Sequence, residues 1–270
     1  MTKFRPCIDL HAGQVKQIVG GTLDSSTDAL KTNHVSLEPA GHFARLYRDH
    51  SLRGGHVIML GPKNDEAATE ALAAWPGACK SGAGSMTATP GCGWRRGPRR
   101  WVVECYLLGF LSGVVYACIH HAQRDFLQED LELTVRLLNG DKQKLVIDLS
   151  CRKRGEDRWF VAMNKWQTIT DMEVNQETIK ELEPYCSEFL IHAADNEGLQ
   201  KGIDETLVQR LAEWCSIPVT YAGGGRHLED LDLVAKLSGG KVDLTIGSAL
   251  DCFGGSGVKF DDCVAWNNKS

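Results

Sequence analysis

The sequence lacks several features that would assign it to a common class of protein. It has no basic excess, because 30 lysines and arginines stand against 35 aspartates and glutamates and give a formal net charge of −5. Proteins that bind nucleic-acid phosphates usually carry such an excess, so we expect no nucleic-acid partner. The ten cysteines lie far apart without a C-x₂-C pair, which excludes the common zinc and redox motifs. This spacing predicts reduced thiols in a cytoplasmic protein.

Signals for export, for a dinucleotide and for a membrane are also weak. The start, MTKFRPCIDLHAG, lacks the apolar core and cleavage site of a secretory signal. The turn from Asp9 to Gly13 lacks the G-x-G-x-x-G pattern of dinucleotide-binding sheets. The segment from Trp101 to Ile119 is nearly continuous apolar sequence after four arginines, as in a membrane span. It contains Glu104, however, and a carboxylate within a span is costly, so we expect no membrane contact.

What the chain does contain is an alternation of short apolar runs and longer amphipathic stretches. Apolar runs that end in polar or glycine-rich turns lie at 7–10, 56–61, 102–108, 145–151, 188–195, 218–225 and 242–250. Stretches with apolar residues at helical spacing lie at 65–75, 129–139, 176–186, 205–215 and 227–237. This alternation is typical of a parallel α/β sheet. With 270 residues, the chain suits one (β/α)₈ barrel domain over 1–270, because such barrels take about 250 residues.

Two aspartates stand in matching contexts. Asp9 lies in the string CIDL and Asp148 in the string VIDL, as expected if the barrel has two related halves. In a barrel the C-terminal ends of the strands carry the active site. Either carboxylate alone could simply cap a following turn. As a pair facing one pocket they could act as acid and base, one donating a proton and the other accepting one.

Two glycine-containing turns predict a phosphate site. Gly223, Gly224 and Gly225 end one apolar run, and Gly247 and Ser248 end the next. Glycines let backbone N–H groups approach an anion closely, and a short helix after the second turn would add donors. A triple glycine alone is more often a simple turn, so the prediction depends on the two turns together.

The run at 188–195 ends in further polar residues. Asp195 and Glu197 are candidates for assisting the chemistry or for binding substrate hydroxyls. His192 lies within the run, and we expect it to pack in the core rather than to act as a base.

Three more residues are candidates with weaker signals. Lys16 and Gln17 follow the first run and are candidate phosphate or hydroxyl ligands, although such residues are usually solvated. Trp166 could cover a planar heterocycle, although a tryptophan at such a point is at least as often part of the core.

Several longer strings resemble one enzyme family. FRPCIDLHAGQVKQIVGGTL, LVIDLSCRK, FLIHAADNEGL, IPVTYAGGG and VDLTIGSALDCFGG closely resemble the eukaryotic ProFAR isomerases of histidine biosynthesis. The resemblance covers about residues 3–77 and 126–268. It implies a barrel enzyme that interconverts an aldose and a ketose, through the Amadori rearrangement of a bis-phosphorylated imidazole carboxamide ribotide.

The same resemblance assigns residue roles. It implies that Asp9 is the proton acceptor and Asp148 the proton donor. It places one of two phosphate sites at the loops Gly223 to Gly225 and Gly247 to Ser248. It implies neither a metal nor an organic cofactor.

Between about residues 78 and 125 the chain departs from that family. The family's LQVGGGI strand and first phosphate loop are replaced by ACKSGAGSM at 78–86, whereas 102–107 again resembles its fourth strand. Codons for the replaced residues permit LQVGGGIN one frame over. We hypothesise a shifted reading frame over 78–100 and a retained non-coding insert over about 109–125, which would damage the third strand and one phosphate site.

Two alternatives remain at this point. One is the related barrel cyclase that makes imidazole glycerol phosphate, which also has two such aspartates, although the first loop from Lys16 to Val19 and the stretch from Asn164 to Trp166 fit the isomerase better. The other is a non-catalytic barrel that binds phosphorylated metabolites, because LQVGGGI is missing. Nothing in the sequence indicates an interface, so we expect a monomer.

Overall fold

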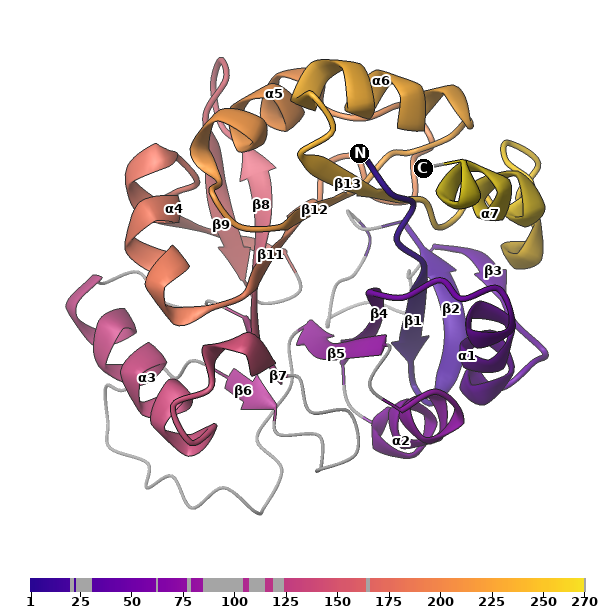
Figure 1. Ribbon diagram of the computed structural model, residues 1–270, viewed down its shortest axis with the longest axis horizontal. Coiled ribbons are helices and arrows are strands. Elements are labelled where there is room, and N and C mark those ends of the chain that lie inside the picture. The colour runs from indigo at the N-terminus through magenta and orange to yellow at the C-terminus, as the bar shows by residue number, and fades with distance from the viewer. Residues whose placement is uncertain are drawn as a thin grey trace.

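A ring of parallel strands forms the centre of the molecule (Figure 1). The computed structural model describes residues 1–19, 22, 31–61, 63–76, 79–84, 104–106, 115–118, 124–163 and 166–269. The strands of the ring are β1 (Cys7–His11), β4 (Gly55–Leu60), β5 (Cys79–Gly84), β7 (Val115–Cys118), β8 (Leu145–Lys153), β11 (Glu188–Ala193), β12 (Val219–Ala222) and β13 (Val242–Thr245). Two runs of parallel pairs, β1–β4–β5 and β7–β8–β11–β12–β13, make up this ring.

Two junctions close the ring. Leu244 of β13 forms a parallel bridge with Phe4, just before β1, and Arg5 N donates to Leu244 O at 2.9 Å. On the opposite side β5 lies beside β7. The fold is therefore the (β/α)₈ barrel that the alternation of runs predicts.

Helices surround the ring on its outside (Figure 1). Within the described residues they are α1 (Ala40–Asp49), α2 (Asp65–Ala74), α3 (Arg124–Leu137), α4 (Gln176–Leu182), α5 (Glu205–Trp214), α6 (Glu229–Ser238) and α7 (Phe260–Asn268), with 3₁₀ turns at Lys142–Lys144, Glu183–Tyr185 and Asp251–Phe253. Asn175 and Asp204 cap α4 and α5, because each side chain accepts a hydrogen bond from a backbone N–H in the first turn. The helical spacing predicts five of these helices but not α1 or α7.

The two strands that carry the candidate aspartates have the same local extension. β1 continues through antiparallel partners β2 (Gln14–Ile18) and β3 (Thr32–Val35), and β8 continues through β9 (Trp159–Met163) and β10 (Thr168–Glu173). The matching strings around Asp9 and Asp148 thus correspond to matching strand meanders. This is what two related half-barrels would show.

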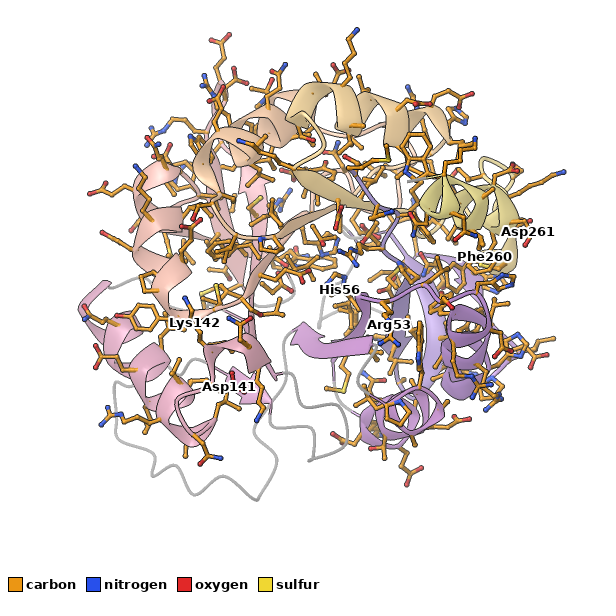
Figure 2. The ribbon with its side chains drawn as sticks, viewed as in Figure 1. Arg53, His56, Asp141, Lys142, Phe260 and Asp261 are labelled. Carbon is orange, nitrogen blue, oxygen red and sulfur yellow. The ribbon has the colours of Figure 1, made fainter. Side chains whose placement is uncertain are left out.

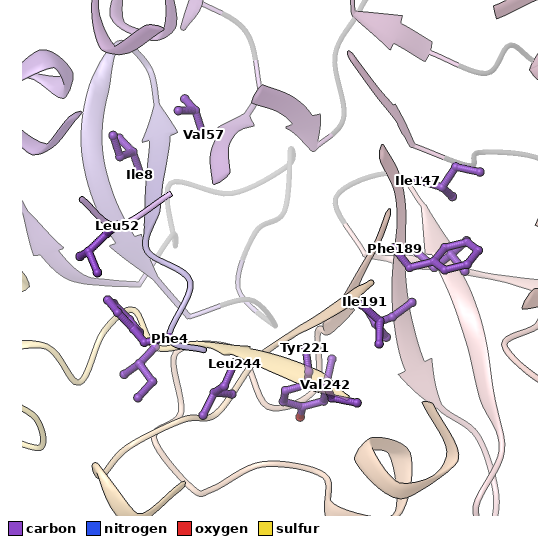
Figure 3. Close-up of a cluster of buried hydrophobic side chains, with 14 of the residues drawn as sticks. Phe4, Ile8, Leu52, Val57, Ile147, Phe189, Ile191, Tyr221, Val242 and Leu244 are labelled. Carbon is purple, nitrogen blue, oxygen red and sulfur yellow. The ribbon is translucent and has the colours of Figure 1, made fainter. Parts of the chain in front are cut away.

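The strands have two different faces because side chains alternate along a strand. Outward residues such as Ile8, Val57 and Ile147 pack between the ring and the helices (Figure 3). Inside the ring, Val146 and Leu190 form a separate small cluster. The inner face also holds polar groups, and His56 is labelled near the centre of the ring in Figure 2.

One predicted strand is displaced. The run at 102–108 was expected to be the fourth strand, but β6 (Glu104–Tyr106) pairs antiparallel with β7, and β7 is the parallel neighbour of β8. A ring strand must run parallel to its neighbours, and 115–118 does so while 104–106 does not. The third strand, expected to be damaged, is present as β5 parallel to β4.

Other expectations for this region fall largely outside the described residues. They include the loop after Gly84 and most of the apolar segment from Trp101 to Ile119. Among the helices that the structure describes, none combines the length and the apolar character needed to cross a bilayer.

Candidate active site

A pocket lies among β1, β4, β11, β12 and the loops at the C-terminal ends of the ring strands. Asp9, His192, Glu197 and both glycine-containing turns line it. The structure therefore brings most of the predicted site residues to one end of the barrel.

Asp9 extends from β1 into this pocket. Its Oδ2 accepts hydrogen bonds from Gln17 Nε2 at 3.0 Å and from Cys7 Sγ at 3.6 Å. Burial, and secondarily the charge of Glu197, raises the pKa of Asp9 to about 7, while His192 acts in the opposite direction. Asp9 can therefore both accept and release a proton near neutral pH.

Asp148 lies on the neighbouring half of the barrel. It is 7% exposed, and its Oδ1 accepts a hydrogen bond from Ser150 Oγ at 3.0 Å. It is not among the residues that line the pocket, but its charge raises the pKa of His192, which does line it. Asp148 thus lies within electrostatic reach of the pocket lining.

The glycines of the first turn have conformations that other residues rarely adopt. Gly223 has φ +121° and Gly224 has φ +81°, and a Cβ at Gly224 would collide with the carbonyl oxygen of Gly202. Gly225 continues the turn along the pocket wall. This bare backbone is the kind of surface that can approach an anion closely.

The second turn contacts the first strand meander. Ser248 Oγ donates to Gln17 Oε1 at 3.3 Å, and a Cβ at Gly247 would lie 2.5 Å from the same oxygen. The helix expected after this turn is a short 3₁₀ turn, Asp251–Phe253. Gln17 is fully buried and joins Asp9 to Ser248, so the candidate base and the candidate phosphate turn share one hydrogen-bonded side chain.

His192 departs from its predicted role as a core residue. It lines the pocket, and its Nε2 lies 2.8 Å from Glu197 Oε2. The ring of Trp166 meets the ring of His192 edge to face, with 4.7 Å between centroids. Trp166 itself is 6% exposed and packs with Ile18 and Leu60, so it forms part of a wall rather than a free lid.

Comparison with known proteins identifies the family. A family model described as Histidine biosynthesis protein matches residues 126–255. A relative from Neurospora crassa is 65% identical over the whole of both chains. One from Saccharomyces cerevisiae is 49% identical over all of this chain and 99% of its own, and one from Medicago truncatula is 39% identical over 99% of this chain and 82% of its own.

All three relatives are named 1-(5-phosphoribosyl)-5-((5-phosphoribosylamino)methylideneamino) imidazole-4-carboxamide isomerase, the Medicago protein with the addition chloroplastic. The chain belongs to this isomerase family. We refer to it as the ProFAR isomerase family, and the resemblance of the longer strings is confirmed. The alignment with the Neurospora relative spans the whole chain and therefore includes the atypical region at about 78–125.

Besides Asp148 and Trp166, two more predicted site residues of this ProFAR isomerase family member lie outside the pocket lining. Asp195 accepts hydrogen bonds from Arg152 Nε and from the backbone N–H of Lys153, each at 2.7 Å, and so ties the loop after β11 to the end of β8. Lys16 lies on β2 opposite Val35 and is not among the lining residues. Within the part of the chain that the structure describes, no group of three His, Cys, Asp or Glu side chains could hold a metal ion.

The structure places two residues, Gln17 and His192, more centrally in the candidate site than the sequence predicts. Gln17 had only a weak signal as a ligand, and its contact with Asp9 depends on the return of β2 alongside β1. His192 shares strand parity with Glu188 and Leu190, which also face the barrel interior. That parity was readable from the sequence, because the last inward residue of a barrel strand faces the site.

Proposed function

We propose that this chain converts the aminoaldose (ribosyl) arm of the bis-phosphorylated substrate of ProFAR isomerases into the aminoketose (ribulosyl) arm. The observation that supports it most is the placement of Asp9 in one pocket with two glycine-containing turns. A carboxylate that titrates near neutral pH can serve in acid–base catalysis, and the turns offer backbone donors to a phosphate.

Asp148 and Asp9 divide the proton transfers in this proposal. Asp148 protonates the ribosyl ring oxygen, which opens the ring as a Schiff base. Asp9 then removes the proton on C2 to give an enolamine, which tautomerises to the ketone. A base with a pKa of about 7 is suited to this step, since a catalytic pKa near the working pH balances availability against proton affinity.

The phosphates supply the positioning. We assign one phosphate to Gly223, Gly224, Gly225, Gly247 and Ser248, where bare backbone faces the pocket. Holding both ends of a long substrate fixes the reacting carbon against Asp9, which is a large part of such catalysis. The second phosphate loop would follow β5, beyond Gly84 and outside the described residues. Asp195 and Lys16 would act at most on the outer parts of the substrate.

The remaining features of the proposal concern partners and place. We propose a monomer that needs no cofactor and binds neither nucleic acid nor membrane. The formal net charge of −5 supports the absence of nucleic acid. A cytoplasmic location is supported by six cysteines that are free thiols, Cys7, Cys151, Cys186, Cys215, Cys252 and Cys263.

The direct test is turnover of the ribosyl substrate by the purified full chain, followed by chromatography of the ribulosyl product. We expect conversion, and a loss of about 10²- to 10⁴-fold in kcat for Asp9→Asn and for Asp148→Asn. Asp49→Asn, an exposed carboxylate on α1, is the matched control and should keep wild-type activity.

Other outcomes favour the alternatives. A folded chain that binds the substrate without converting it would be a binding barrel. Conversion of the ribulosyl form with ammonia to imidazole glycerol phosphate would indicate the cyclase. Growth of a histidine auxotroph that lacks the isomerase, restored by this chain, checks the same activity in a cell.

A further inference from the structure

The proposed reaction has a proton inventory that two aspartates do not complete. Relative to the ring-closed aminoaldose, the ketose has gained a proton on the ring oxygen and on C1, and has lost one from C2 and one from the 2-hydroxyl. Asp9 can carry the proton from C2 to C1, and Asp148 can supply the proton that the ring oxygen gains. If the proposed function holds, some group must still accept the proton of the 2-hydroxyl and restore the acid form of Asp148.

His192 lies where such a group is needed. It stands near the C-terminal end of β11, paired in register with Ser150 of β8 and Ala222 of β12, and lines the same pocket as Asp9. The negative charges that face it are Glu197 from the following loop, Asp148 from β8 and Asp9 from β1. The imidazole thus contacts one carboxylate and lies within electrostatic reach of both proposed acid–base carboxylates.

Glu197 determines which ring nitrogen is available. Its Oε2 lies 2.8 Å from His192 Nε2. When Nε2 donates to this carboxylate, the neutral ring has its lone pair on Nδ1. Within the described residues, this is the one hydrogen bond recorded for the ring. The three carboxylates together raise the pKa of His192, although burial alone would lower it. A carboxylate behind a histidine makes the opposite nitrogen a better base.

Trp166 restricts the ring further. Its indole meets the imidazole edge to face at 4.7 Å between centroids, and both side chains are largely buried. The imidazole is therefore held by a hydrogen bond at one edge and by an aromatic contact on its side. A base held in this way needs little reorganisation during the reaction.

We propose that His192, oriented by Glu197, accepts the proton of the substrate's 2-hydroxyl and returns it to Asp148. In the enolamine, the O–H bond breaks as its electron pair becomes the carbonyl π bond, and Nδ1 takes the proton. The C1=C2 electron pair takes the proton that Asp9 holds, so Asp9 becomes a carboxylate again. The imidazolium then passes its proton to the Asp148 carboxylate, and every group regains its starting state without any oxidant, reductant or external base.

The first measurement is steady-state turnover by His192→Gln and Glu197→Gln. We expect kcat to fall about 100-fold or more for His192→Gln and about 10-fold or more for Glu197→Gln, with KM changed less than kcat. The matched controls are His42→Gln and Glu38→Gln, which alter an exposed histidine–glutamate pair with 3.5 Å between His42 Nδ1 and Glu38 Oε2. These should behave like the wild type, and circular dichroism confirms that each variant folds.

The second measurement separates a proton acceptor from a merely structural residue. The substrate carries deuterium at C2, and the loss of deuterium from recovered substrate is compared with product formation. If His192 acts on the 2-hydroxyl, His192→Gln still forms the enolamine, so deuterium loss per turnover rises well above the wild-type ratio. Asp9→Asn should instead lose both processes.

The outcomes separate this proposal from the proposed function. Parallel loss of exchange and turnover in folded His192→Gln, or turnover within twofold of wild type, overturns the role of His192. A wild-type chain that does not convert the substrate overturns the proposed function itself, whatever the variants do.

Discussion

Two histidine–glutamate pairs lie inside the same ring of strands but near its opposite ends. His56 and Glu188 stand near the N-terminal ends of β4 and β11, with 3.1 Å between Nε2 and Oε1 and with side chains 1% and 6% exposed. His192 and Glu197 stand at the C-terminal end, with 2.8 Å between Nε2 and Oε2 and with side chains 13% and 15% exposed. The two pairs have the same chemical groups in different surroundings.

Their surroundings indicate different tasks. Thr220 Oγ1 also donates to Glu188 Oε1 at 3.0 Å, so the carboxylate of the inner pair, His56 and Glu188, has two partners within the barrel. Both histidines line the pocket that holds Asp9, but only the outer pair, His192 and Glu197, also contributes its glutamate to the lining. In barrels of this kind the N-terminal end serves stability and the C-terminal end serves chemistry. A buried polar pair therefore does not by itself mark a catalytic site; its place along the strands does.

The largest expected effect on stability comes from breaking the inner pair. Glu188→Ala leaves His56 and Thr220 without their shared carboxylate, and we expect a loss of about 3–5 kcal/mol in the free energy of unfolding. Urea unfolding at pH 7 measures it. Glu197→Ala should cost less, because Glu197 also raises the pKa of Asp9 by repulsion, which its removal relieves. Equal losses in the two variants would contradict the division between the ends.

The second effect concerns the stability that the fold loses by burying Asp9. The pKa of Asp9 is about 7 in the fold against an ordinary 3.8, so between these values the folded state holds more protons than the unfolded one. Stability therefore falls as pH rises from about 4 to 7, and the shift corresponds to at most about 4 kcal/mol. Asp9→Asn removes this dependence.

We expect the free energy of unfolding of Asp9→Asn, measured relative to that of the wild type, to be greater at pH 8 than at pH 4. Thermal or urea unfolding at both pH values measures the difference. The exposed Asp49→Asn should show no such trend. A gain that is the same at pH 4 and pH 8 would mean that Asp9 does not titrate as its burial implies.

The contrast between the ends also explains what the sequence could predict. Asp9, Asp148 and the glycine turns could be proposed from the sequence because each lies in an apolar run or ends one, and parallel strands bring their C-terminal ends to one face. The sequence did not predict the inner pair, because Glu188 is the first residue of its apolar run and contacts His56 only across the ring. Pairing across a barrel is set by tertiary closure, which no local pattern records.

The fourth strand shows the same limit. The run at 102–108 has the composition of a ring strand, yet β7 takes the position beside β8 and β6 folds back on it. Composition is common to both segments, whereas direction relative to β8 decides which one joins the ring. Direction is a property of the assembled sheet, so the apolar pattern alone could not select between them.

A third prediction sharpens the account of the inner pair. Replacing both partners, as in His56→Leu with Glu188→Met, removes both buried polar groups, whereas a single replacement leaves one of them without its partner. We expect the free energy of unfolding of the double variant to lie within about 1–2 kcal/mol of the wild-type value and well above that of either single variant. A double-mutant cycle in urea gives the coupling between the two residues. Additive losses would show that they are independent of each other.

The smallest effect belongs to the histidine–glutamate pair outside the barrel. His42 Nδ1 and Glu38 Oε2 are 3.5 Å apart at the start of α1, with side chains 45% and 59% exposed. Water and salt screen such a pair, so Glu38→Ala should change the free energy of unfolding by less than about 0.5 kcal/mol at 0.1 M salt. Urea unfolding of this variant beside Glu188→Ala completes a series ordered by exposure. A loss at Glu38 comparable to that at Glu188 would mean that burial is not what distinguishes the pairs.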